Sequence, residues 1–174
     1  MVADTEMDQI VRRSLTTFVD DVFQIAWTAR EHESVSRYVL GHLVNHVGQS
    51  TLLKVVTQIC IHGAVPGITG INPKGRVNKD LQIWPVEHQT GWTKDRKLEF
   101  IPLCIQEWKV FRRGKKTPTM SDYDIDWLCA FTGQHETCTG YAVSLDLEQR
   151  KYRLSVTRIA SGIANRVWLN LPSC

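Results

Sequence analysis

The stretch IPLCIQEWKVF, residues 101–111, is the most apolar strand-forming segment of the chain, and it carries two opposite charges. Its β-branched and aromatic residues favour a strand. Glu107 and Lys109 are two positions apart, so in a strand both side chains project from the same face. Burying a carboxylate and an ammonium is costly unless each is paired or binds a metal. The stretch therefore predicts a mostly buried strand whose two charges have a chemical role.

The flanking sequence predicts helices before this strand and a mixture of strands and helix around it. Apolar residues at helical spacing predict helices over 4–29 and 30–47, the second ending before Gly48. Ser121 is the expected N-cap of a helix over 122–132 that stops at Gly133. Strands are expected over residues 52–61, 80–86, 98–111, 139–147, 152–159 and 167–171, with an irregular loop over 62–78 and a polar hairpin loop over 87–97. Within the 98–111 segment, Pro102 indicates that the strand starts after it or bulges there. This order predicts an α/β (mixed α+β) fold in which a central mixed sheet is flanked by helices.

Composition narrows the class of protein. The chain has 174 residues, 43% hydrophobic and 22% charged, which is typical of one globular domain. A net charge of +3 does not by itself indicate a nucleic-acid partner. The first residues lack the apolar core of a signal peptide, and no run long enough to span a membrane occurs. The five cysteines lack CxxC spacing, so we expect reduced thiols and a cytoplasmic protein without a membrane partner.

The spacing acid-x-Lys occurs twice, and its surroundings distinguish the two occurrences. Asp95 and Lys97 lie among charged neighbours and are expected at a solvated hairpin tip. Glu107 and Lys109 instead lie in the apolar strand. An ion pair on a partly exposed edge strand is the alternative interpretation of this second pair.

Two further acids occupy unusual positions. Asp80 begins a predicted apolar strand after the glycine-rich loop, and Glu31 extends the apolar stripe of the second helix backwards. Carboxylate oxygens are the ligands that Mg²⁺ prefers, and Mn²⁺ accepts the same ligands. Asp80 and Glu107 are therefore candidate ligands for Mg²⁺ or Mn²⁺. Lys109 is a candidate for orienting or deprotonating the attacking water, or for stabilising the transition state.

In this order the residues resemble the PD-(D/E)XK, or restriction-endonuclease-like, nuclease superfamily. The matching positions are Glu31 on a helix, Asp80 on a strand, Glu107-Trp108-Lys109 on the next strand, and then a helix and a further strand. The resemblance implies a single domain over 1–174, with an N-terminal helix (1–29), a nuclease core (30–147) and C-terminal strands (148–174). It implies a metal-dependent DNA endonuclease with Glu31, Asp80, Glu107 and Lys109 as catalytic residues. Lys79 stands where the pattern has proline, and Glu99 or Asp95 is the alternative to Asp80.

Arg112, Arg113, Lys115 and Lys116 directly follow the acid-x-Lys strand and are candidates for binding DNA phosphates. A solvated charged loop is the alternative. Trp92 is a candidate for stacking on a base or meeting a partner subunit, and a homodimer or a larger nucleoprotein assembly is compatible with cutting both strands. The competing function is a non-catalytic nucleic-acid-binding or assembly module that keeps the nuclease fold.

Zinc sites are weaker candidates. His42 and His46 have the spacing of helical zinc ligands but belong to an apolar stripe, which favours core or boundary histidines. Cys129, His135 and Cys138, with Cys60 or His62, fit no strong zinc pattern. The acids Asp122, Asp124 and Asp126 are interpreted as favouring a helix start rather than binding calcium.

Overall fold

A six-stranded mixed sheet organises the computed structural model, which describes residues 5–50, 58–68, 71, 75–85, 100–111, 120–147 and 153–172. The strands lie side by side in chain order, and their bounds are β1 (Gln58–Pro66), β2 (Arg76–Trp84), β3 (Cys104–Phe111), β4 (Thr139–Asp146), β5 (Arg153–Ala160) and β6 (Ile163–Pro172). β3 and β4 run parallel, and every other neighbouring pair is antiparallel. The predicted class, a mixed sheet with helices, is confirmed.

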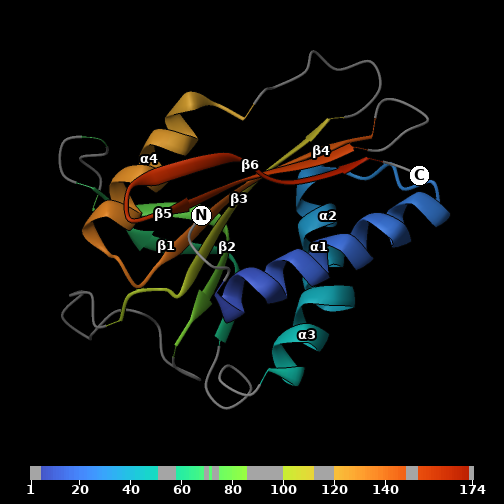
Figure 1. The fold of residues 1–174 in the computed structure, drawn as a ribbon, viewed down its shortest axis with the longest axis horizontal. Coiled ribbons are helices and arrows are strands. Elements are labelled where there is room, and N and C mark those ends of the chain that lie inside the picture. The colour runs from blue at the N-terminus through green and yellow to red at the C-terminus, as the bar shows by residue number, and fades with distance from the viewer. Residues whose placement is uncertain are drawn as a thin grey trace.

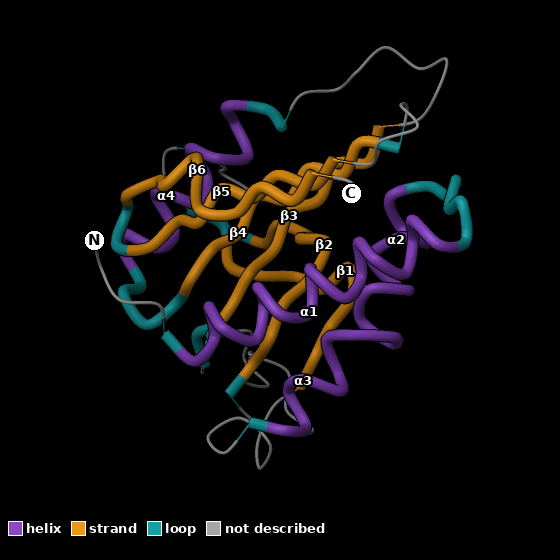
Figure 2. The backbone as a smooth tube through the Cα atoms, turned by 45° about the vertical axis from the view of Figure 1, so that its right-hand side comes forward, coloured by secondary structure: helices purple, strands orange, loops and turns teal. Residues whose placement is uncertain are grey.

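Helices cover both faces of the sheet (Figure 1). α1 (Glu6–Gln24), α2 (Glu31–Tyr38) and α3 (Val44–Gln49) lie over one face, and α4 (Asp122–Gln134) lies over the other (Figure 2). α4 connects β3 to β4, as a parallel pair requires. It begins as predicted, because the Ser121 side chain accepts a hydrogen bond from the Asp124 N–H at 3.1 Å.

The sheet therefore separates two apolar layers. On the α1–α3 side, Phe18, Tyr38 and Trp108 are fully buried and meet at ring-centroid distances of 5.0–5.7 Å. On the other side, Trp127 and Phe131 of α4 stack at 5.0 Å over apolar residues of the sheet. Alternate residues of β3 supply both layers: Cys104 and Trp108 belong to the first and Ile105 to the second.

A buried ionic cluster attaches the start of α1 to the sheet. Thr5 and Asp8 form a capping box, and Asp8 is fully buried. The Asp8 carboxylate also accepts hydrogen bonds from Tyr141 at 2.8 Å and from Arg158 at 2.6 Å. Although burial opposes ionisation, the bonds from Arg158, Thr5 and Tyr141 together lower the pKa of Asp8.

The second predicted helix is continuous but contains a π turn. The turn covers Val39–Leu43 and joins α2 to α3. Neither predicted glycine stop is correct, because α3 continues through Gly48 to Gln49 and α4 continues through Gly133 to Gln134. Both helices end instead at a residue with non-helical backbone angles, Ser50 and His135.

The largest difference from the predicted elements concerns β1 and β2, which extend into the segment expected to be an irregular loop. Residues 62–66 and 76–78 belong to the two strands, and β1 pairs with β2 from Gln58–Trp84 to Pro66–Arg76. Gly63 lies against the end of the buried Gln82 side chain, and a Cβ atom there would lie 2.0 Å from the Gln82 side-chain oxygen, so any larger residue would need that side chain to move. Pro102 was expected to precede the strand or to form a bulge in it, and β3 starts after it.

The thiols of Cys60, Cys104, Cys129 and Cys138 are free. Among the described residues, no helix is both long and apolar enough to cross a membrane.

Candidate functional site

The candidate site lies where β2 and β3 stop pairing. Their paired residues run from Ile83–Cys104 to Leu81–Gln106, and the pairing ends before Asp80 and Glu107. The Trp108 N–H donates instead to Oδ2 of Asp80 at 2.7 Å. Asp80 was predicted to begin a strand, but it is the fifth residue of β2. The break in the ladder leaves two acidic side chains facing each other across neighbouring strands.

Glu107 is buried between a lysine and a second acid. The Lys79 ammonium forms an ion pair with Oε1 of Glu107. Burial raises the pKa of Glu107 to about 7; Lys79 opposes this rise, whereas the charge of Asp80 and a hydrogen bond to its carboxylate add to it. Asp80 and Glu107 are therefore close enough to share one proton or one cation.

Lys109 and Glu31 form the outer part of the site. Nζ of Lys109 lies 3.8 Å from Oε2 of Glu31, the first residue of α2, and donates to the carbonyl of Trp108 at 2.9 Å. Burial raises the pKa of Glu31, and Lys109 opposes the rise. The charge of Asp80 raises it further, so the Glu31 carboxylate lies within electrostatic reach of the Asp80–Glu107 pair.

Two histidines extend the site towards solvent. Nδ1 of His62 lies 3.6 Å from Oδ1 of Asp80, and Nε2 of His62 shares a hydrogen bond of 2.6 Å with Nδ1 of His32. The two rings stack at a centroid distance of 4.7 Å. His62 lies opposite Asp80 in the β1–β2 register and has a left-handed backbone, with φ of 53°. Strain of this kind is concentrated at functional positions.

The donor set suits a hard divalent cation in one respect. Two carboxyl groups at hydrogen-bonding distance repel each other when both are ionised, and a proton or a cation between them removes that repulsion. Within the described ranges, however, no three His, Cys, Asp or Glu side chains are grouped so as to hold a metal ion. Asp80 and Glu107 are the side chains that would hold one, and the rest of its coordination would come from water or substrate.

The structure thus brings together the four candidate catalytic residues, from α2, β2 and β3. The candidate DNA-binding residues Arg112, Arg113, Lys115 and Lys116 lie outside the described residues, as do Trp92, Asp95 and Glu99. Only their sequence position, directly after β3, relates the four basic residues to the site.

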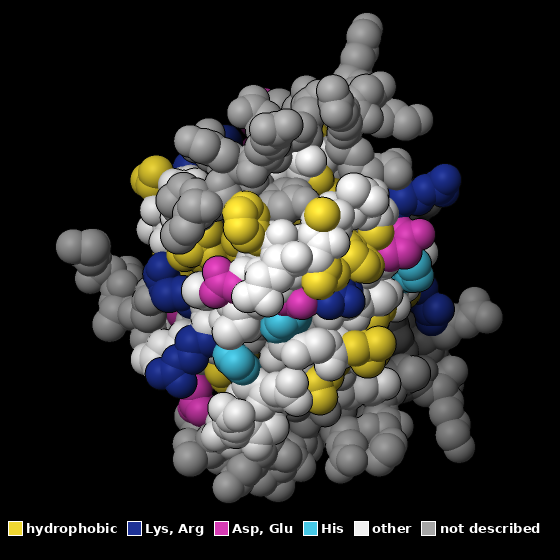
Figure 3. All heavy atoms as spheres, turned by 90° about the vertical axis from the view of Figure 1, so that its right-hand side faces the viewer, with side chains coloured by type: hydrophobic (Ala, Val, Ile, Leu, Met, Phe, Trp, Pro, Cys, Tyr) yellow, Lys and Arg dark blue, Asp and Glu magenta, His cyan; other side chains and the backbone are white. Residues whose placement is uncertain are grey.

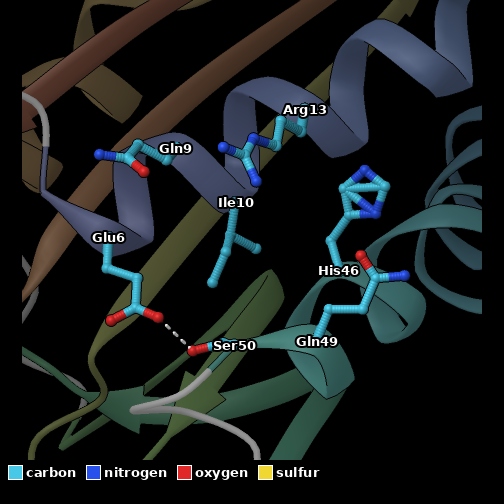
Figure 4. A pocket seen from close by; sticks show the side chains of 7 residues that line it. All are labelled: Glu6, Gln9, Ile10, Arg13, His46, Gln49 and Ser50. Atoms are coloured by element: carbon cyan, nitrogen blue, oxygen red, sulfur yellow. Dashed lines mark hydrogen bonds between the residues drawn. The ribbon is translucent and has the colours of Figure 1, made fainter.

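The helical zinc candidates His42 and His46 lie away from this site, whereas His62, named with the weak cysteine pattern, belongs to it. His42 contacts Thr17 and Asp21 of α1, at 3.1 and 3.2 Å. His46 lines a pocket of about 150 Å³ between the start of α1 and the end of α3 (Figure 4). Ser50 and Glu6 are hydrogen bonded across this pocket, and no candidate catalytic residue lines it.

The face of the molecule that carries α2 and the end of α1 is mixed in character. Basic, acidic, histidine and apolar side chains alternate over the described part of it (Figure 3). The described side chains of this face therefore form no extended basic surface for a phosphate backbone.

The sequence interpretation gave Lys79 and His32 no role at this site, and it named His62 only with a weak zinc pattern. Lys79 was noted only as a departure from a pattern, and its 3% exposure could not be expected of a lysine between two polar neighbours. A signal did exist for His62, because its register opposite Asp80 follows once β1 is extended through Gly63.

Comparison with known proteins identifies no family: no family model, curated protein or solved structure matches the chain.

Proposed function

We propose that the protein is a Mg²⁺- or Mn²⁺-dependent DNA endonuclease with a restriction-endonuclease-like core. The observation that carries the proposal is the convergence of Glu31, Asp80, Glu107 and Lys109 at the break between β2 and β3. Glu31 lies on α2, Asp80 on β2, and Glu107 and Lys109 on β3, which α4 joins to its parallel neighbour β4.

Each residue has a role that follows from its contacts. Asp80 and Glu107 would hold the metal, because their carboxyl groups already face each other. Lys109 would orient or deprotonate the attacking water, or stabilise charge on the phosphate, and Glu31 would position the Lys109 ammonium from 3.8 Å. The bound metal would lower the pKa of a water molecule and neutralise charge on the scissile phosphate.

The DNA partner rests on charge next to the site. Arg112, Arg113, Lys115 and Lys116 follow β3 and would bind phosphates beside Lys109. The cytoplasm is the proposed location. A homodimer or a larger nucleoprotein assembly would supply a second site for cutting the other strand.

The test is Mg²⁺-dependent cleavage of plasmid DNA by Lys109→Ala. Because Lys109 is only 24% exposed, circular dichroism and thermal melting check that the variant protein still folds. We expect cleavage to fall by roughly a hundredfold or more, the usual loss when a general acid–base or electrostatic group is removed. Arg13→Ala is the matched control, since it removes an exposed cation on α1 away from the site. Undiminished cleavage by folded Lys109→Ala would refute the assignment.

A second candidate function is favoured by one contact. The Lys79 ammonium already neutralises Glu107, which is what a protein that keeps this fold without catalysis would need. Such a protein would bind DNA with or without a divalent cation, and neither wild type nor any site variant would cleave it.

A further inference from the structure

Lys79 is buried beside the carboxyl pair with contacts that fix its ammonium. Its side chain is 3% exposed, pairs with Glu107 and lies 4.0 Å above the ring of Trp127 on α4. Its backbone carbonyl accepts a hydrogen bond of 2.6 Å from the Gln82 side chain. A lysine is rarely buried to this extent unless it is paired, so its place in the site needs an explanation.

The charges around Lys79 explain what it does. Asp80 and Glu107 bring two negative charges when ionised, and Lys79 brings one positive charge. The remaining contacts of Asp80 are the Trp108 N–H and the His62 ring, at 2.7 and 3.6 Å. Lys79 is therefore the ammonium that directly neutralises the pair. It contacts the Glu107 carboxylate, where a bound metal ion would otherwise lie.

On the basis of the metal site proposed above, we propose that Lys79 is a built-in monovalent cation, which a divalent cation displaces from Glu107 when it binds. Lys79 is then a positioning residue: it holds the carboxyl pair together without metal and sets the metal concentration that the site needs. A divalent ion carries twice the charge of the ammonium and attracts both carboxylates more strongly. Its binding is weakened by the free energy of breaking the Lys79–Glu107 pair.

A purely structural ion pair makes a different prediction. In that case, removal of Lys79 destabilises the fold and leaves metal affinity unchanged. If Lys79 competes with the metal, its removal destabilises the metal-free protein, tightens metal binding, and makes stability depend on the metal. Metal affinity therefore separates the two roles, whereas stability alone does not.

The experiment measures Mn²⁺ binding to the full chain by electron paramagnetic resonance of free Mn²⁺, together with thermal melting. For Lys79→Met we expect binding at least about tenfold tighter than wild type, and a melting temperature that Mn²⁺ restores. Lys109→Met is the matched control, because the same substitution removes an ammonium that contacts Glu31 and not Glu107. In the double variant Lys79→Met/Glu107→Gln, the tighter binding of Mn²⁺ should disappear.

Equal Mn²⁺ affinity in wild type and Lys79→Met overturns the proposal, and so does equal tightening in Lys109→Met. Wild type offers a second measurement if Lys79→Met does not fold: the magnetic resonance signal of the Lys79 ammonium should shift when Mg²⁺ is added. A signal that stays unchanged at every Mg²⁺ concentration also overturns it.

The proposed nuclease activity can fail independently. If no form cuts DNA but Lys79→Met binds Mn²⁺ tightly, the inference about Lys79 stands and the nuclease does not. If wild type cuts DNA and Lys79→Met has wild-type Mn²⁺ affinity, the nuclease stands and the role of Lys79 is purely structural.

Discussion

Asp8 and Glu107 are both carboxyl groups buried against a basic side chain, yet their environments have opposite effects. Arg158, Tyr141 and Thr5 all donate to Asp8, and its pKa is lowered. Among the described residues, Glu107 has one cation and a second acid beside it, and its pKa is raised. The donors around Asp8 compensate its buried charge. The surroundings of Glu107 described here compensate its charge less fully, as the proposed metal site would require.

The difference shows that burial of a charge does not identify its role. The number and sign of its neighbours do, because each hydrogen bond to a carboxylate favours ionisation and each neighbouring acid opposes it. Asp8 should therefore be costly to replace. Glu107 should also be costly for folding, because its replacement removes the carboxylate that pairs with the buried Lys79 ammonium, but only Glu107 belongs to the proposed metal site.

The largest expected effect on stability is that of Asp8→Asn. It leaves the Arg158 guanidinium without its carboxylate partner, and breaking a buried ion pair in this way typically costs about 3–5 kcal/mol. Urea denaturation measures the loss. Asp20→Asn, at an exposed position of α1, should change stability by no more than about 0.5 kcal/mol. A loss of stability for Asp8→Asn as small as that for Asp20→Asn would contradict the environment assigned to Asp8.

The pH dependence of stability should have opposite signs at the two positions. Glu107 binds a proton more tightly in the folded state, so its contribution is present at low pH and is lost as pH rises from 4.5 towards about 7. Relative to Glu107→Gln, wild type should lose on the order of 2 kcal/mol over that range. The contribution of Asp8 to folding stability is instead present above the ordinary pKa of 3.8. It is lost as pH falls through the lower pKa that Asp8 has in the folded protein.

Urea denaturation across this pH range, for wild type, Glu107→Gln and Asp8→Asn, measures both slopes. A wild type that gains stability relative to Glu107→Gln as pH rises would contradict the environment assigned to Glu107.

The smallest expected stability effect is that of Glu31→Gln. Glu31 is 35% exposed and contacts Lys109 at 3.8 Å, so we expect a change within about 0.5 kcal/mol. Its loss should nevertheless lower DNA cleavage by about 10–100-fold, because it positions Lys109. Glu33→Gln, two residues further along α2 and exposed, should leave both quantities unchanged. Equal cleavage by the two variants would exclude a role for Glu31.

Much of the fold could be predicted because local signals agree with the tertiary structure. β3 has apolar residues on both faces beside its two charges, and α4 has a Ser121 cap, so their sequence patterns specify them. The extension of β1 could not be predicted, because Gly63 and Pro66 are typical of loops. The Gln82 side chain occupies the space that a Cβ atom at position 63 would take, a contact that only the packed sheet reveals.

The same limit applies to the site. Glu107, Lys109 and Asp80 are visible in the sequence because each is a charge beside apolar strand residues. The partner of Glu107 is not visible: only the alternative interpretation, an edge-strand ion pair, joined it to Lys109, whereas the ion pair is formed with Lys79 on β2. Cross-strand partners depend on where the β2–β3 ladder ends, and local patterns do not contain that information.

The contact between Asp8 and Arg158 joins residues that are 150 positions apart. During synthesis the ribosome releases the N-terminal helix long before Arg158 has left the exit tunnel. The Asp8 carboxylate must therefore wait for almost the whole chain before its buried partners exist. Since α1 also packs against α2, which carries Glu31, a nascent chain that has not yet reached Arg158 lacks the contact that joins the start of α1 to β5.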